Sequence, residues 1–226
     1  MKTSLVTSNF RPAGLAVVMA CILAVFAPLR AHGQIIYDNG PPNQLSGNEM
    51  TEWIQAEDFS VGTAMTLGSV KFWDIELPGP SYQGEIDWGI YSDAGGSPGV
   101  LLASGAAIGG AVTRTFIQPG ILGTYNEYSD SFNVTPFALA AGTTYWIGLH
   151  NGPLTFQTRS EFYWETTNAN ASFNGHELIA PFNGGWADNG QQHAFQLFAV
   201  PEPSTWALLG LGMCGLFCVG WRRRAA

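Results

Sequence analysis

The sequence predicts an all-β fold for residues 34–199, an antiparallel β-sandwich of the jelly-roll type. Apolar and polar residues alternate here with a period of two, as in Ile86, Trp88 and Ile90, and no segment follows the 3.6-residue period of a helix. Glycine and proline recur at short intervals, which keeps the expected strands short. No repeat of fixed length is present, which argues against a propeller or a solenoid.

The alternating segments define the expected strands in chain order. Residues 128–134 alternate over seven positions, and residues 145–149 run into His150-Asn151-Gly152, which is a turn signal. Roughly nine strands follow from such segments, near residues 35–38, 54–59, 65–77, 84–92, 112–118, 128–134, 145–149, 162–166 and 195–199.

One segment between these strands formally matches the G-x-S-x-G nucleophile elbow of hydrolases, the run Gly95-Gly96-Ser97-Pro98-Gly99. The elbow needs the backbone N–H of the residue after the serine for its oxyanion hole. Pro98 has no backbone N–H, and no helix pattern follows. We therefore expect a hairpin turn at this position and no serine nucleophile.

The charge of the domain excludes one class of function. Residues 34–200 contain sixteen acidic side chains against three basic ones, Lys71, Arg114 and Arg159, an excess of thirteen negative charges. Such a domain repels phosphate backbones, so nucleic-acid binding is excluded. The domain has no cysteine, so neither a disulfide nor thiolate chemistry is expected.

The N-terminal segment has the pattern of a secretory signal peptide, residues 1–33. Lys2 and Arg11 precede an apolar run over residues 13–27, and small residues follow at Ala31 and Gly33. These are the charged region, the apolar helix and the cleavage site of an export signal, with the cut before Gln34. We expect Sec-type export machinery to carry the chain out of the cytoplasm.

The C-terminal segment, residues 200–226, predicts a membrane helix. An apolar run from Trp206 to Trp221 is followed by Arg222, Arg223 and Arg224. Its sixteen residues would span roughly 24 Å as a helix, slightly less than a bilayer core. The tryptophans occupy positions typical of interface anchors, and the arginines favour a cytoplasmic end, so the domain would face outward.

With Pro201, Glu202 and Pro203 before the apolar run, this ending resembles the PEP-CTERM sorting signal. The resemblance implies recognition by an exosortase-type membrane protease and cleavage near the Pro-Glu-Pro motif. It also implies passage through the inner membrane and delivery to the cell surface or extracellular matrix of a Gram-negative, exopolysaccharide-producing bacterium. Permanent anchoring by an uncut helix is the alternative.

Acidic residues flank the loop at residues 78–83. If the strands on either side formed a hairpin, Glu76 would face Glu85 and Asp74 would face Asp87. Opposed like charges are destabilising unless a cation, solvent or a shifted register relieves them. Oxygen ligands favour Ca²⁺, so these four carboxylates are a candidate calcium site, with a solvated acidic face as the alternative.

Glu57 and Asp58 form a second candidate cation pair. The histidines His150, His176 and His193 lack the spacing of a zinc site, and we expect them in loops or on the surface. No cofactor is expected.

Aromatic residues suggest contact with sugars. Trp146 and Tyr163 have the opposite parity to Ile147 and Phe162, so we expect them on the surface, where a sugar ring can stack on them. The domain also resembles exported domains found upstream of PEP-CTERM tails. Its runs at residues 36–40, 55–59 and 142–149 carry that likeness, which implies a sandwich similar to carbohydrate-binding modules.

We therefore expect a non-enzymatic exported protein of the cell surface or matrix that contacts exopolysaccharide. The competing hypothesis is a glycan-active enzyme that uses paired carboxylates such as Glu85 and Asp87. A glycosidase needs two carboxyl groups that flank a sugar-sized cleft.

Overall fold

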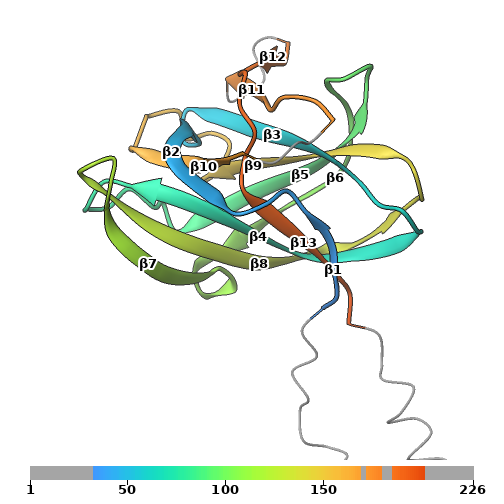
Figure 1. Ribbon diagram of the computed structural model, residues 1–226, viewed down its shortest axis with the longest axis horizontal. Helices are drawn as coiled ribbons and strands as arrows, with labels where there is room; N and C mark the ends of the chain where they lie inside the picture. Colours follow the sequence, from blue (N-terminus) through green and yellow to red (C-terminus); the bar gives the residue numbers. More distant parts are fainter. Residues whose placement is uncertain (1–32, 169–171, 180–184, 202–226) are drawn as a thin grey trace, which may run out of the picture. The chain divides into compact units, whose positions relative to one another are not determined.

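The computed structural model describes residues 33–168, 172–179 and 185–201, which form two antiparallel sheets (Figure 1). The seven-stranded sheet contains β1 (Ile35–Asp38), β2 (Pro42–Glu49), β4 (Met65–Glu76), β7 (Thr113–Ile121), β8 (Tyr125–Leu139), β10 (Phe162–Thr167) and β13 (Phe195–Ala199). The six-stranded sheet contains β3 (Trp53–Ser60), β5 (Glu85–Asp93), β6 (Pro98–Ile108), β9 (Thr144–Asn151), β11 (His176–Ile179) and β12 (Ala187–Asp188).

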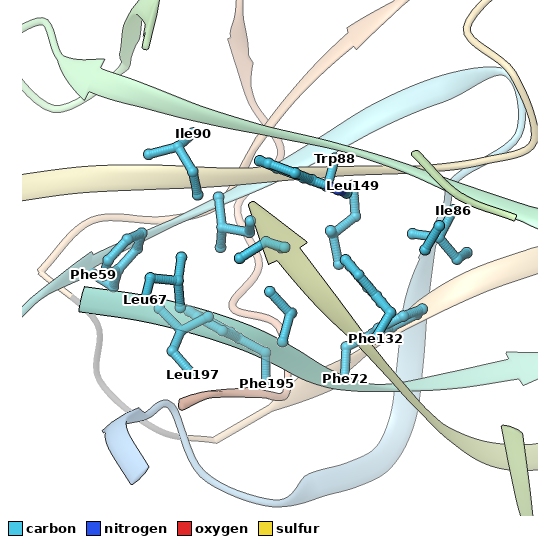
Figure 2. Close-up of a cluster of buried hydrophobic side chains, with 14 of the residues drawn as sticks. Phe59, Leu67, Phe72, Ile86, Trp88, Ile90, Phe132, Leu149, Phe195 and Leu197 are labelled. Atoms are coloured by element: carbon cyan, nitrogen blue, oxygen red, sulfur yellow. The ribbon is translucent and has the colours of Figure 1, made fainter. Parts of the chain in front are cut away.

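The two sheets share one apolar core. Phe72, Phe132 and Leu197 contribute to it from the seven-stranded sheet, and Ile86 and Leu149 contribute from the six-stranded one (Figure 2). All five side chains are buried. Every second residue of these strands therefore faces the core, as the period-two pattern predicts.

All nine predicted strands are present, and the all-β prediction is confirmed for the described residues. The helices predicted at the two ends of the chain lie outside the described residues. Strands β2, β6, β11 and β12 were not predicted. Strand β2 is almost entirely polar, and β6 contains mainly glycine, alanine and exposed aliphatic residues, so neither shows a clear alternation.

The predicted hairpin between residues 70–77 and 84–92 is wrong, because the two strands lie in different sheets. Strand β4 pairs with β8 along one edge and with β10 and β13 along the other, so no edge is left for β5. The loop between them crosses from one sheet to the other. Asn151 holds it there, accepting a hydrogen bond from the Gln83 backbone N–H and donating one to the Ser81 carbonyl oxygen.

The predicted hairpin turn after β5 is confirmed. Asp93 accepts hydrogen bonds from the backbone N–H groups of Gly95 and Gly96, both of which have positive φ, and the chain then enters β6. Asp93 also accepts a hydrogen bond from the Trp146 indole at 3.0 Å. Ser97 therefore lies in a turn that connects two paired strands.

Candidate binding site on the outer face of the six-stranded sheet

A row of residues with little or no side chain crosses the outer face of the six-stranded sheet. Gly89 of β5 pairs with Gly148 of β9, which pairs on its other side with Ala56 of β3. Ser104 of β6 pairs with Gly89. Because the neighbouring residues along β5 and β9 point into the core, this row lies on the opposite, outer face.

The ring of Tyr91 lies over this glycine row. A Cβ atom added at Gly89 would lie 2.9 Å from the Tyr91 ring, and one added at Gly148 would lie 2.8 Å from it. Both positions therefore need glycine so that the ring can lie against the sheet. Burial raises the pKa of Tyr91 to about 12, so its hydroxyl stays protonated and can donate a hydrogen bond.

Next to this ring is a cavity of about 340 Å³, at the small end of the range for ligand sites. Its walls combine apolar side chains with a few polar ones. They include Ile54, Asp87, Tyr91, Leu101, Ser104, His150 and Leu154. Asp87 and His150 are paired across β5 and β9, so they lie side by side at one end of the cavity.

His150 is fully buried and contributes an unprotonated nitrogen to this region. Its Nδ1 lies 2.8 Å from the carbonyl oxygen of Gly152, which can only accept, so Nδ1 carries the proton. Within the described chain, Nε2 has no hydrogen-bond partner. Burial lowers the pKa of His150, although the Gly152 and Thr51 backbone oppose this shift. The ring is therefore neutral, with Nε2 as a hydrogen-bond acceptor.

Glu85 and Asp87 follow each other on the same face of β5 and act as one titrating pair. Burial raises the pKa of both carboxyls; the hydrogen bond between them raises the pKa of Glu85 further and opposes the rise for Asp87. Of the two, Glu85 is thus the group whose protonated form the pair favours more. Asp87 also accepts a hydrogen bond from the Leu154 backbone N–H at 3.0 Å.

The other two predicted calcium ligands lie in the seven-stranded sheet, so the four carboxylates are not brought together. Asp74 and Glu76 pair with Arg114, at 3.1 Å and 3.5 Å, and Asp130 joins them at 3.0 Å. The Arg114 guanidinium also lies over the ring of Tyr82, 4.3 Å from its centroid. An arginine of the chain itself thus supplies the positive charge that the acidic cluster requires.

The prediction that Trp146 and Tyr163 are exposed is wrong. Trp146 is fully buried, because Phe173 stacks on it from the segment that also carries β11 and β12. Tyr163 is buried in a small cluster with Ile75 and Ile121. Their parity does place them on the outer faces, but other segments cover both faces at these points.

Glu57 and Asp58 point to opposite faces of β3 and do not form a pair. Glu57 contacts Nδ1 of His193 at 2.8 Å, while Asp58 accepts a hydrogen bond from the Phe173 backbone N–H. His193 stacks on Trp164, and burial lowers its pKa to about 3 while raising that of Glu57. Both groups therefore favour their neutral forms in this buried contact.

The surface positions expected for His150, His176 and His193 are also wrong, since all three are buried. His150 and His176 lie in β9 and β11, whereas His193 does lie in the loop before β13. In the part of the chain that the structure describes, no group of three or more histidine, cysteine or acidic side chains has the arrangement of a metal site. The calcium prediction therefore gains no support from the geometry.

Most predicted sorting residues lie outside the described residues. These are Ala31 before the domain and, after it, Glu202, Pro203, Trp206, Trp221, Arg222, Arg223 and Arg224. Gly33 and Gln34 directly precede β1, and Pro201 is the last described residue. In the described ranges, no helix is long and apolar enough to cross a membrane.

The described residues thus define a cysteine-free, two-sheet β domain with a cavity on one outer face. Residues 199–224, which begin with the last residue of β13, match the PEP-CTERM protein-sorting motif. No curated protein matches the chain. The sorting motif indicates a bacterial protein that is exported, passes through a membrane and is sorted to the surface by an exosortase-type protease.

Proposed function

We propose that this protein is a non-enzymatic surface or matrix protein whose β-sandwich binds an uncharged polysaccharide at the outer-face cavity. The observation that carries this proposal is the cavity itself. Its lining combines apolar side chains with polar groups that can form hydrogen bonds, and the domain that holds it is followed by a sorting motif for the cell surface. A Gram-negative bacterium that produces exopolysaccharide is the expected setting.

The polar groups around the cavity suit sugar hydroxyls, which both donate and accept hydrogen bonds. The Asp87 carboxylate can accept, whereas the Tyr91 hydroxyl can donate. Ile54 and Leu154 offer apolar surface for the C–H faces of a sugar ring. The excess of negative charge disfavours an anionic polysaccharide, because such a chain would be repelled.

The arrangement of Glu85 and Asp87 supports binding without turnover. Glycosidase carboxyls lie about 5 to 9.5 Å apart, on either side of the scissile bond. Here the two groups stand two residues apart on one strand, and only Asp87 lines the cavity, so they do not lie on either side of a bound sugar. Release of new reducing ends that is lost in Glu85→Gln would overturn the non-enzymatic proposal.

We expect Asp87→Ala to weaken polysaccharide binding about tenfold, the effect of losing one or two hydrogen bonds. The test is affinity electrophoresis of the protein through gels that contain dextran, pullulan or a soluble β-glucan. Asp38→Ala is the matched control, because it removes an exposed carboxylate from β1 in the other sheet. Equal retardation of both variants, or retardation by none of the three glucans, would contradict the proposed site.

Cleavage near the Pro-Glu-Pro motif predicts that the mature protein lacks the apolar run and the arginines. In a host that carries an exosortase, mass spectrometry should find a C-terminus close to Pro201. Glu202→Ala should leave the tail attached and hold the protein in the membrane fraction. An intact C-terminus in the unmodified chain would instead indicate permanent anchoring.

A further inference from the structure

Strand β6 forms one edge of the six-stranded sheet and pairs only with β5 in the described part of the chain. Irregular pairing is confined to its first residues, and the strand pairs regularly from Ala103 to Ile108. The outward backbone N–H and C=O groups of this edge are an open template for another strand. Exported proteins usually protect such edges with charged side chains, prolines or a covering segment.

Strand β6 has no charged side chain, and its one proline, Pro98, is its first residue. Residues 94–126, which include β6 and the next strand in the chain, β7 of the other sheet, contain a single charged side chain, that of Arg114. Arg114 forms ion pairs with Asp74, Glu76 and Asp130 of the seven-stranded sheet. The rest of the domain carries all sixteen acidic residues of residues 34–200.

The exposed apolar side chains concentrate on the same segment. Among the described residues, ten large hydrophobic side chains are exposed, and seven of them belong to residues 100–122. These seven are Val100, Leu101, Leu102, Ile108, Phe116, Ile117 and Leu122. Four of the seven lie on β6 itself, and such a concentration of exposed apolar side chains is typical of an interaction site.

We infer that β6 pairs antiparallel with β6 of a second copy of this chain, across a two-fold axis, so that two six-stranded sheets become one continuous sheet. Two copies repel each other through most of their acidic surface, and the uncharged edge is where they can approach without that cost. A basic partner would find no charge here to attract it. An antiparallel pair of identical strands makes the same contacts on both sides and closes at two copies.

The test is proximity crosslinking of the full chain in a host that exports it. In a background with serine in place of Cys21, Cys214 and Cys218, Ala106→Cys puts one thiol near the middle of the regular part of β6. A short bismaleimide added to the cells should yield a crosslinked dimer. Thr63→Cys, an exposed thiol in the β3–β4 loop, is the control for random collisions.

Adding a negative charge to the edge should prevent the contact. Ile108→Asp in the Ala106→Cys chain should reduce the dimer at least tenfold, because each copy would then carry a charge on the edge that pairing must desolvate. Leu45→Asp on β2 is the matched control, with a side chain that is 68% exposed against 64% for Ile108, and it should leave the dimer unchanged. If Ile108→Asp lowers the amount of protein, Val100→Asp at the other end of β6 serves in its place.

Three outcomes would overturn the inference. The first is no dimer with Ala106→Cys when the immunoblot shows the protein at its usual level. The second is an equal dimer yield with Thr63→Cys. The third is an adduct that mass spectrometry identifies as a different protein. Polysaccharide retardation does not enter this readout, so failure of the dimer and failure of the binding proposal are distinguishable.

Discussion

Replacing Arg114 by methionine should lower the free energy of unfolding by about 3–5 kcal/mol at pH 7, the typical cost of removing one partner from a buried ion pair. Arg114 is the cation for Asp74 and Asp130, both fully buried, and for Glu76. Without it, these carboxyls must either ionise in the interior without compensation or take up protons. Either course destabilises the folded state at neutral pH.

The loss should shrink as the pH falls. Even beside Arg114, burial raises the pKa of Asp130 to about 6 and that of Asp74 well above its ordinary value. The variant's folded state therefore binds more protons than its unfolded state, and its stability rises on acidification. Urea unfolding of residues 33–201 by tryptophan fluorescence at pH 5 and pH 7 measures both effects.

Arg159→Met is the control for this experiment. Arg159 pairs with Glu161 at 3.1 Å, but its side chain is 54% exposed, so the loss should stay below about 1 kcal/mol. Similar losses for both variants, or an Arg114→Met loss that is the same at pH 5 and pH 7, would show that the buried cluster does not depend on its arginine.

The alternation of apolar and polar residues predicted the strands, because burial of one face imposes a period of two on any strand. This holds regardless of which strands are its neighbours. The same pattern carries no information about which strands are neighbours. The pattern therefore allows a hairpin that brings Asp74 next to Asp87, although the two residues belong to different sheets. An arginine forty residues after Asp74 in the chain completes the cluster, and only the tertiary fold brings it there.

Exposure on an outer face could not be predicted for a related reason. Trp146 does point outward, but the segment with Phe173, far along the chain, covers it. The cavity escaped prediction because its lining includes Gly89 and Gly148, residues that on their own suggest a turn or a bulge. Two glycines at aligned positions of two predicted strands, with a tyrosine two residues away, are the signal that could have indicated it.

Glu165 should make the protein less stable as the pH rises from 5 to 8. This side chain is fully buried; its Oε1 accepts a hydrogen bond from the Gln44 backbone N–H at 3.0 Å, and its Oε2 has no partner within the described residues. Burial, and secondly the charge of Glu127, raise the pKa of Glu165 to about 8. The folded state thus keeps a proton that the unfolded chain releases near its ordinary pKa of 4.5.

The stabilisation from this proton is complete below about pH 4.5 and is lost progressively up to about pH 8, because the folded state binds more protons throughout that interval. One proton difference gives about 1.4 kcal/mol per pH unit, and we expect a total of about 2 kcal/mol after allowing for local relaxation and solvent screening.

Glu165→Gln keeps an oxygen for Gln44 and cannot ionise. It should therefore gain about 2 kcal/mol at pH 8, gain little at pH 5, and flatten the pH dependence in urea unfolding. Asp38→Asn on exposed β1 should leave the slope unchanged, and a slope that survives in Glu165→Gln would assign the pH dependence to another buried carboxyl such as Asp74 or Glu57.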